Sequence, residues 1–519
     1  MGLLKRAARM VGLAGEVTAA PAASERKEPT IEAITKRSFS MARHSRLTRS
    51  WTGRSSAGDA DQVIYRDHET LRQRAREQSI NSGHAKRFYR LLRQNVIGPH
   101  GIQLQSKAEK ADGTADDAWR RTIEKEFKQW SRRGNCDVTG RYGFTTFMWL
   151  WIETLARDGE VMVRLVKNWP NRWGFALQIL ESDRLDTNLN TWLDNGHRVR
   201  MGVEIDEWER PIAYWLKHDH PGDIYRTPGA KDYDRIPADE LRLTFDPWRP
   251  HQSRGFTWTH AGANELHHID EYAHAELVAA EQGAKITGHY EQDAEWIDPP
   301  GDDEEEDGVI VEDIEAGTAR LLPYGVTFKP YDNKHPSTNF APFTKAAVRK
   351  VAAAFGPSYN RLAHDLEGVS FSSLRSGELD ERDFYKCVQQ FAISELLELV
   401  GDTWLASSVL HGALNIPPRN FHRLSPLEWL PRGWDWVDPK KDSEAAKLGL
   451  ETFTDTVSDI LRRKGIDPDE HFKRIADDRR RFEALGLPDP YGKANTEEPS
   501  NAQEHDADDG DTANATGTD

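Results

Sequence analysis

Apolar residues recur every three or four positions in several segments, the spacing that places them on one face of a helix. The clearest case lies between Thr114 and Gly134, where the repeat consists of Trp119, Ile123, Phe127 and Trp130. A glycine commonly ends a helix, so this pattern predicts a helix that stops before Gly134. The other predicted helices span residues 67–94, 145–157, 259–284, 342–355 and 380–400.

Between residues 161 and 245 the apolar period changes to two, as expected for strands whose side chains alternate between two faces. The predicted strands span residues 161–166, 175–180, 201–205, 212–216 and 241–245. Turn residues such as Asn195-Gly196 separate them, and the gaps are short. The pattern therefore predicts an α+β fold with an antiparallel or mixed sheet.

The carboxyl-terminal part carries residues typical of helix ends. Asp455 precedes an apolar repeat that is closed by Gly465, which predicts a capped helix. Asp467-Pro468 then combine an N-cap with a proline at the first helical position, and they predict a last helix that ends at Gly486.

Both ends of the chain lack an apolar period. Residues 1–40 are rich in Ala, Ser, Glu and Pro, and residues 491–519 in Asn, Asp, Glu, Gly and Thr. Such segments bury too little apolar surface to offset their chain entropy, so we expect both to be disordered. An acidic loop at residues 302–307 is expected between short extended pieces at 309–311 and 326–329.

Composition narrows the class of protein. The chain has 519 residues, of which 37% are hydrophobic and 30% charged, with a mean hydropathy of -0.74. No apolar run approaches the roughly twenty residues that a membrane helix requires. Two cysteines, Cys136 and Cys387, exclude a disulfide scaffold or a four-cysteine zinc site. We therefore expect a soluble, intracellular protein that does not enter a membrane.

Charge is unevenly distributed along the chain, whose net charge is -16. Residues 1–100 hold 19 basic and 9 acidic side chains, so they carry +10 and the remainder carries -26. Phosphate binding requires clustered Lys and Arg. The acidic remainder argues against a protein that grips nucleic acid over its whole surface, but it allows DNA to pass without sticking.

Catalytic motifs are scarce in the sequence. It contains no glycine-rich phosphate loop and no G-x-S-x-G nucleophile turn. The best candidate metal group consists of His267, His268, Asp270 and Glu271, with His260 and His274 nearby, but HExxH is absent. We expect no catalytic residue, metal or cofactor. The alternative is a metal-dependent hydrolase or, because the chain has 17 tryptophans, a carbohydrate-active one.

Five stretches, in order over roughly residues 45–488, together resemble the lambda-type family of bacteriophage portal proteins. They are residues 71–102, 157–160 (Arg-Asp-Gly-Glu), 236–255, 324–375 and 433–440. The first stretch includes a row of arginines at Arg72, Arg74 and Arg76, and the third ends in Arg254-Gly255. Each stretch alone is a weak signal, whereas the ordered set is specific.

The resemblance implies a portal fold: a mixed α/β wing, a two-helix stem, a small α/β clip and a helical crown. Such subunits assemble as a ring, usually of twelve. The predicted elements occur in this order, so we assign residues 1–40 to a disordered arm, 41–255 to the wing, 256–286 to the first stem helix, 287–336 to the clip, 337–357 to the second stem helix, 358–380 to a tunnel loop region, 381–490 to a wing return helix and the crown, and 491–519 to an acidic tail.

The resemblance also implies a function. Portal rings form a channel at one capsid vertex, through which the terminase packages double-stranded DNA and through which the DNA is later ejected. The implied partners are further copies of the chain, double-stranded DNA, the large terminase subunit, head-completion or adaptor proteins, and the major capsid and scaffolding proteins. The implied location is the virion, and the host cytoplasm during assembly.

Candidate site residues follow from this assignment. Lys345 and Arg349 are four residues apart and share a helix face, with Lys350 beside them, so we expect a basic stripe in the channel. A tunnel loop over residues 367–378 would contribute Ser372, Ser373 and Arg375.

Two further groups of residues are expected to contact other proteins. Residues expected at the contact between subunits are Arg72, Arg74, Arg76 and Arg254. Residues expected to dock partners on the clip are Asp302, Asp303, Glu304, Glu305, Glu306 and Asp307.

Overall fold

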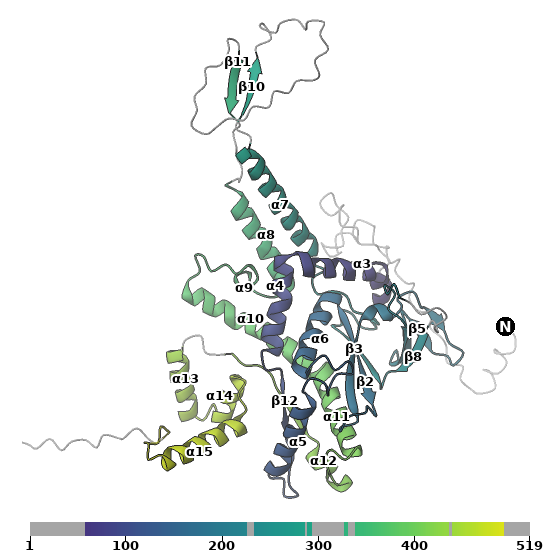
Figure 1. The fold of residues 1–519 in the computed structure, drawn as a ribbon, viewed down its shortest axis with the longest axis vertical. Helices are drawn as coiled ribbons and strands as arrows, with labels where there is room; N and C mark the ends of the chain where they lie inside the picture. The colour runs from purple at the N-terminus through teal and green to yellow at the C-terminus, as the bar shows by residue number, and fades with distance from the viewer. Residues whose placement is uncertain are drawn as a thin grey trace, which may run out of the picture. The chain divides into compact units, whose positions relative to one another are not determined.

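The computed structural model describes residues 58–225, 233–285, 288–292, 326–330, 338–434 and 439–491. Its elements belong to a unit that begins at Ala60, and they combine helices with antiparallel sheets (Figure 1). The predicted mixture of helix and sheet is confirmed. The acidic residues 302–307, the extended piece at 309–311, and most of both chain ends lie outside the described residues.

The first helical region contains three segments rather than the one predicted for residues 67–94. They are α3 (Ala60–Asn81), α4 (Gly83–Leu92) and the π-helical turn η2 (Arg93–Ile97). The break falls at Ser82, whose backbone is extended with φ -94° and ψ 125°. Gly83 follows at once, and glycine is a poor helix former, so the chain can turn here at little cost.

The next two helices confirm their predictions. In α5 (Asp117–Trp130), the Asp116 side chain accepts a hydrogen bond from the Trp119 N–H at 3.2 Å and caps the first turn. In α6 (Phe144–Asp158), Gly159 ends the helix in the left-handed conformation with φ 86°.

Two antiparallel sheets follow, so the antiparallel alternative of the prediction is confirmed. A three-stranded sheet has the order β3-β2-β9, with β2 at Glu160–Lys167, β3 at Phe175–Leu180 and β9 at Leu241–Phe245. A five-stranded sheet has the order β4-β5-β6-β7-β8. Its strands are β4 (Thr191–Trp192), β5 (Arg198–Arg200), β6 (Val203–Ile205), β7 (Pro211–Lys217) and β8 (Tyr233–Pro237). The turn η3 (Ser182–Arg184) follows β3.

Strand β2 lies between two hydrophobic cores. Val161, Val163 and Leu165 on one face join a large core made mainly of helices. Met162 on the other face joins a smaller core shared by the two sheets, together with Tyr214. Because side chains alternate along a strand, this one segment holds both cores together.

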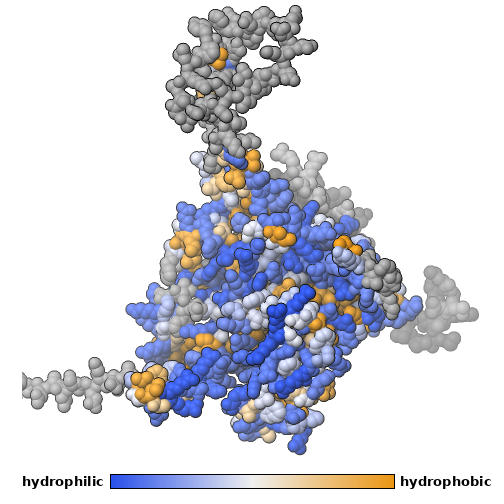
Figure 2. Space-filling model, viewed as in Figure 1, coloured by the Kyte–Doolittle hydropathy of each residue, from blue (hydrophilic) through white to orange (hydrophobic). Residues whose placement is uncertain are grey.

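Two helices pack side by side beyond the sheets. They are α7 (Ala263–Lys285) and α8 (Phe340–Phe355), and Tyr272 of α7 contacts Phe340 and Phe343 of α8 at ring distances of 5.5 Å (Figure 1). Part of this pair remains apolar and exposed, and Figure 2 shows orange groups there on a largely hydrophilic surface. Between them in sequence, β10 (Gly288–Gln292) and β11 (Val326–Pro330) form an antiparallel pair.

The loop conformation predicted for residues 367–378 is wrong from residue 371 onward, where the chain is helical. The helix α9 (Tyr359–Ala363) leads to a short turn, and α10 (Phe371–Ala392) begins at Phe371. Ser370 caps α10 by accepting a hydrogen bond from the Ser373 N–H at 3.2 Å, which explains the early start. The helix continues through the π-helical turn η5 (Ile393–Leu397) into α11 (Glu398–Leu410).

The carboxyl-terminal part contains a strand that pairs with β1 (Gln103–Ser106), more than 300 residues earlier in the sequence. This strand, β12 (Leu427–Leu430), follows η6 (Pro418–Asn420) and α12 (Phe421–Leu424). The last helices are α13 (Pro439–Glu451), α14 (Val457–Arg463) and α15 (Pro468–Ala484). Asp467 caps α15 as predicted, whereas α14 is capped by Thr456 rather than by the predicted Asp455. Within the described ranges, no helix has the length and apolar character needed to cross a bilayer.

Candidate functional site

A buried ion pair joins β2 to the segment before α7. Glu160 and Arg254 each have no exposed side-chain surface. Arg254 Nε donates to Glu160 Oε2 at 2.9 Å, and Arg254 Nη1 donates to the Leu185 and Met201 carbonyls at 3.1 and 2.8 Å. The guanidinium therefore joins the two sheets, and a buried charge of this kind needs such partners.

Two residues of α3 extend this cluster. Arg72 Nη1 lies 3.6 Å from Glu160 and donates to Ser182 Oγ at 3.1 Å. His68 Nε2 lies 3.4 Å from the same Glu160 carboxylate. Three basic side chains from two distant segments thus surround one carboxylate.

Arg76 forms a second set of ion pairs beside the first. Its Nη2 lies 2.7 Å from Asp158 and 2.6 Å from Asp183. Arg157 also pairs with Asp158, at 2.8 Å. The first three stretches that carry the family resemblance therefore meet here, through Arg72 and Arg76, Asp158 and Glu160, and Arg254.

Glycines allow these stretches to approach one another. A Cβ on Gly159 would lie 2.0 Å from the Phe256 carbonyl carbon, and a Cβ on Gly255 would lie 2.2 Å from the Gly159 carbonyl oxygen. Both distances are far below van der Waals contact. The Arg-Asp-Gly-Glu and Arg-Gly motifs thus have two roles. Their charged residues form ion pairs, and their glycines let the two backbones come into contact.

The surroundings of the charge cluster lower the pKa values of Glu160 and His68. Burial by itself would raise the pKa of Glu160, but the charge of Arg254 and the hydrogen bonds from His68 and Arg254 outweigh it and hold that pKa well below its ordinary value. Burial lowers the pKa of His68 below 6.5. Near neutral pH, Glu160 is therefore ionised and His68 is neutral.

The sequence predicted that these arginines, together with Arg74, lie at the contact between subunits, whereas most of them form ion pairs within the chain. Arg72, Arg76 and Arg254 pair within one chain, and Arg254 has no exposed surface with which to reach another copy. Arg74 points away from the cluster and is exposed. The helical period explains the split, because Arg72 and Arg76 share a face that Arg74 does not.

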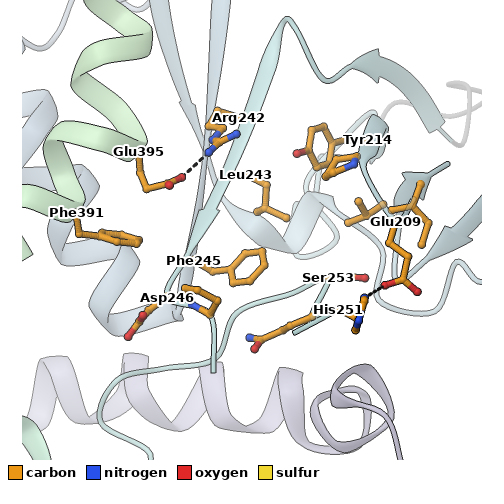
Figure 3. Close-up of a pocket in the computed structure, with 15 residues that line it drawn as sticks. Glu209, Tyr214, Arg242, Leu243, Phe245, Asp246, His251, Ser253, Phe391 and Glu395 are labelled. Carbon is orange, nitrogen blue, oxygen red and sulfur yellow. Dashed lines mark hydrogen bonds and ion pairs between the residues drawn. The ribbon is translucent and has the colours of Figure 1, made fainter. Parts of the chain in front are cut away.

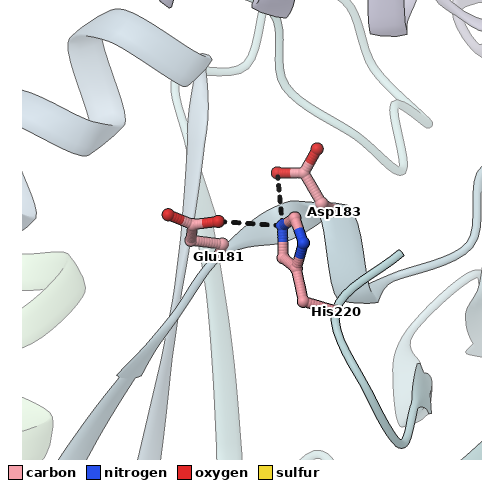
Figure 4. Close-up of side chains that lie close together, drawn as sticks. All are labelled: Glu181, Asp183 and His220. Atoms are coloured by element: carbon pink, nitrogen blue, oxygen red, sulfur yellow. Dashed lines mark ion pairs between the residues drawn. The ribbon is translucent and has the colours of Figure 1, made fainter. Parts of the chain in front are cut away.

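A possible metal group lies at the edge of the cluster, in Glu181, Asp183 and His220 (Figure 4). His220 Nδ1 accepts a hydrogen bond from the Gly222 N–H at 3.0 Å, so the proton of the neutral ring is on Nε2. That Nε2 lies 2.9 Å from Glu181 and 4.0 Å from Asp183. Nε2 carries the proton of the neutral ring and so offers no lone pair to a metal, and Asp183 already pairs with two arginines, so the group does not fit a metal site.

The predicted histidine group on α7 has a different arrangement. His267 Nε2 and His268 Nδ1 lie 3.3 and 3.5 Å from the Glu271 carboxylate, and all three side chains are exposed. Both imidazoles contact the same carboxylate from the same helix. This is the geometry of a surface ion-pair group.

The cations expected to form a stripe on α8 are mostly paired with carboxylates. Lys345 Nζ lies 3.1 Å from Asp365, in the turn after α9, and Lys350 pairs with Glu265 of α7. Arg349 lies over the Tyr359 ring at 5.3 Å, and Lys345 lies over the same ring at 5.7 Å. Of these three cations, only Arg349 forms no ion pair with a described residue.

The same contacts hold the turn between α9 and α10. The Tyr359 hydroxyl donates to Asp365 at 2.7 Å. The Glu367 N–H, the Tyr359 hydroxyl and Lys345 together lower the pKa of Asp365 to about 2. Burial and the Asp365 charge raise the pKa of Tyr359 to about 12. The turn is therefore tied to α8 by an ion pair that persists at neutral pH.

The residues expected in the tunnel loop lie in the first turns of α10. Ser372 and Ser373 are exposed there. Arg375 Nη2 pairs with Asp442 of α13 at 2.9 Å. This pair connects α10 to the carboxyl-terminal helices, so Arg375 is not a free cation.

A cavity of about 570 Å³ lies between the sheets and the end of α10 (Figure 3). Among its charged residues, Arg242 pairs with Glu395 at 2.5 Å and His251 pairs with Glu209. Asp246 has no ionic partner among the described residues, and burial raises its pKa. Two of the three carboxylates that line the cavity are therefore engaged in ion pairs.

Comparison with known proteins identifies the chain. The family model for "Phage portal protein, lambda family" matches residues 44–389, which is most of the chain. The chain is thus a portal protein of a phage head. It belongs to the lambda family of phage portal proteins, as the sequence resemblance predicted.

Individual relatives agree with this family. The chain is 74% identical over 522 residues to the probable portal protein of Halomonas phage phiHAP-1, with 100% of both chains covered. It is 20% identical over 481 residues to portal protein B of Escherichia phage lambda, covering 85% of this chain and 89% of that one. Among solved structures, the neck of an empty GTA particle has a TM-score of 0.46 at 17% identity, covering 82% of this chain and 94% of that one.

Proposed function

We propose that twelve copies of this chain close into a ring around a channel for double-stranded DNA. In this proposal α3–α6 and the two sheets form the wing, α7 and α8 the stem, the segment containing β10 and β11 the clip, and α13–α15 the crown. The clip's acidic residues 302–307 dock partner proteins. The role is structural, without bond-making by the chain itself.

The observation that carries the proposal is the antiparallel pair α7–α8 and the turn tied to its end. Gly262, just before α7, lies close to Ala354 and Phe355 at the end of α8, while Tyr272 contacts the start of α8. The chain then enters the turn that Lys345 and Asp365 hold against α8. Repeated around a ring, such a helix pair would form a tube whose inner end carries twelve turns.

The charge distribution suits a channel in which DNA slides. The chain is acidic overall, with a net charge of -16, so its surface repels phosphate. Most cations of α8 are neutralised by carboxylates, which leaves Arg349 as a weak, repeated contact. A duplex held by many shallow contacts moves more easily than one bound tightly at a few points.

The proposed partners follow from this role. They are the large terminase subunit during packaging, head-completion or adaptor proteins afterwards, and the major capsid and scaffolding proteins around the wing. The protein would assemble in the host cytoplasm and remain in the virion.

The mass of the purified full-length particle tests the assembly. We expect about twelve chains of 59.0 kDa by native mass spectrometry and an open central channel in electron-microscopy class averages. A particle that stays monomeric at micromolar concentration, or a ring with a closed centre, would contradict the proposal.

Charge reversal tests the stem. Lys345→Glu with Arg349→Glu should leave the ring mass unchanged and reduce the DNA retained in packaged heads several-fold, because both the turn contact and the free cation change sign. The matched control is Arg121→Glu with Lys125→Glu, two exposed cations with the same spacing on α5. Equal retention by the stem variant and the control would remove these residues from the channel.

A further inference from the structure

A second basic surface lies on α4, outside the residues that the family resemblance singled out for the channel. Lys86, Arg87 and Arg90 lie on its outer side, and Lys86 and Arg90 are both exposed. The opposite side of α4 is buried, with Phe88 packed against Phe355 of α8 at a ring distance of 5.0 Å. We call these three cations the α4 basic strip.

The α4 basic strip differs from the α8 cations because it has no counter-charge in the described part of the chain. Residues 78–108 contain no Asp or Glu, although the chain as a whole is acidic. Arg87 Nε donates to the Arg361 backbone carbonyl at 3.2 Å. Among the described residues, Lys86 and Arg90 have no carboxylate partner. Their charges are therefore available to an anion from outside the chain.

The strip lies beside the turn assigned to the tunnel. Helix α4 is next to α9 in Figure 1, and the Arg87–Arg361 hydrogen bond joins the two helices directly. Helix α9 leads straight into the turn at residues 364–370. A ligand that passes the turn would therefore come close to the strip.

The chemistry of the strip favours a phosphate backbone over a protein surface. Lys86 and Arg90 are four residues apart, so they lie on one helix face about 6 Å apart along its axis. Exposed Lys and Arg without bound carboxylates are typical of phosphate contacts, whereas Lys is depleted where proteins bury their contacts with one another. A neighbouring acidic copy of the chain is the competing partner.

We propose that the α4 basic strip contacts the sugar–phosphate backbone of duplex DNA, without reading its sequence. This inference rests on the proposed channel function and adds a second ring of cations to it, on the wing side of the turn. Unlike Lys345, these cations form no ion pair with any described residue, so they contribute directly to the salt dependence of DNA binding.

The test uses purified rings of the full chain and a fluorescent 30-base-pair duplex, titrated at several salt concentrations between 50 and 200 mM. Lys86→Glu with Arg90→Glu should weaken binding at least tenfold at low salt. The slope of log affinity against log salt should fall by about 0.9 for each phosphate of the bound duplex that the variant no longer neutralises. The matched control, Arg121→Glu with Lys125→Glu, should bind as the wild type does.

Ring mass separates the outcomes. If the wild type forms no ring, the proposed function fails before the strip is tested. Lys86→Gln with Arg90→Gln removes the charges without reversing them and provides a milder variant should the first not fold. Intact rings with an unchanged affinity and slope would overturn the proposal. Loss of the ring in the milder variant would also overturn it, by showing a contact between copies instead.

Discussion

Glu160 is an ionised carboxylate buried away from solvent, and it depends on partners brought from other parts of the chain. The cations Arg254 and Arg72 and the neutral imidazole of His68 all lie within 3.6 Å of it. A buried pair of this kind is not a large source of stability compared with apolar packing, but removing one partner leaves an uncompensated charge. The cluster therefore makes the relative placement of α3, β2 and the Arg254 segment specific.

Arg254→Met tests this dependence. The substitution roughly keeps the length of the side chain but leaves Glu160 with only its weaker partners, so the free energy of unfolding should fall by about 3–5 kcal/mol. Adding Glu160→Leu should recover part of the loss, because an apolar pair needs no counter-charge. Denaturant unfolding monitored by tryptophan fluorescence measures both, and an unchanged midpoint for Arg254→Met would contradict the account.

His68 and Glu160 both make the folded chain less stable as the pH falls. Below about pH 6.5, His68 of the unfolded chain binds a proton that the folded chain excludes, so its contribution is lost as the pH falls. The folded pKa of Glu160 is depressed, so its contribution is lost at still lower pH, below the ordinary value of 4.5. We expect the Tm to decrease from pH 7 to pH 5, and His68→Gln to flatten that decrease. A Tm that rises on acidification would contradict this assignment.

At the scale of elements, the turn from α6 into β2 is set by Gly159. This residue ends the helix with φ 86°, and its α-carbon lies against Phe256 of the returning chain. A side chain would clash with the backbone atoms of Phe256, in the segment that leads to α7. The element boundary and the long-range contact thus need the same glycine.

Gly159→Ala should therefore be much more damaging than an alanine at another left-handed glycine. The matched control is Gly113→Ala, which has φ 79° and nothing within 4 Å of the added Cβ. The control should lose about 1–2 kcal/mol, the cost of the left-handed conformation alone. Gly159→Ala should lose several kcal/mol or fail to fold, as measured by thermal unfolding. Equal losses would show that the close approach is unimportant.

Helix ends were the least predictable feature at this scale. The apolar period correctly located α5, α6 and the strands of the small sheet, but it extended one helix across Ser82 and missed the first turns of α10. These turns contain serines and a glycine, which favour loops. The hydrogen bond accepted by the Ser370 side chain caps the segment and stabilises it as a helix. Strands β1 and β12 were also missed, because each has four residues and is stabilised by the other across more than 300 positions of sequence.

For the molecule as a whole, the exposed Arg74 is the member of the arginine row that remains available to a neighbouring copy. Arg72 and Arg76 are engaged within the chain on the opposite side of α3. The proposed ring places many copies side by side, so an exposed cation on α3 can pair with a carboxylate across the contact.

Arg74→Glu should lower the fraction of chains in rings several-fold at low salt, with no change in the Tm of the subunit, because only the contact between copies is altered. Analytical ultracentrifugation of the full chain gives the ring fraction, and Arg121→Glu is the control on an unrelated helix. A normal ring fraction in Arg74→Glu would exclude Arg74 from that contact.

The sequence by itself determined the local elements, the acidic balance and the family, because the spacing of apolar residues and ordered motifs are carried by neighbouring positions. The first three stretches that resemble the family also contain most of the arginines, carboxylates and glycines that form the charge cluster. Only the tertiary structure decided which charges pair. Glu160 and Arg254 are 94 positions apart, and no local period specifies that they meet. Folding likewise pairs Lys345 and Lys350 of α8 with carboxylates and leaves Lys86 and Arg90 of α4 exposed.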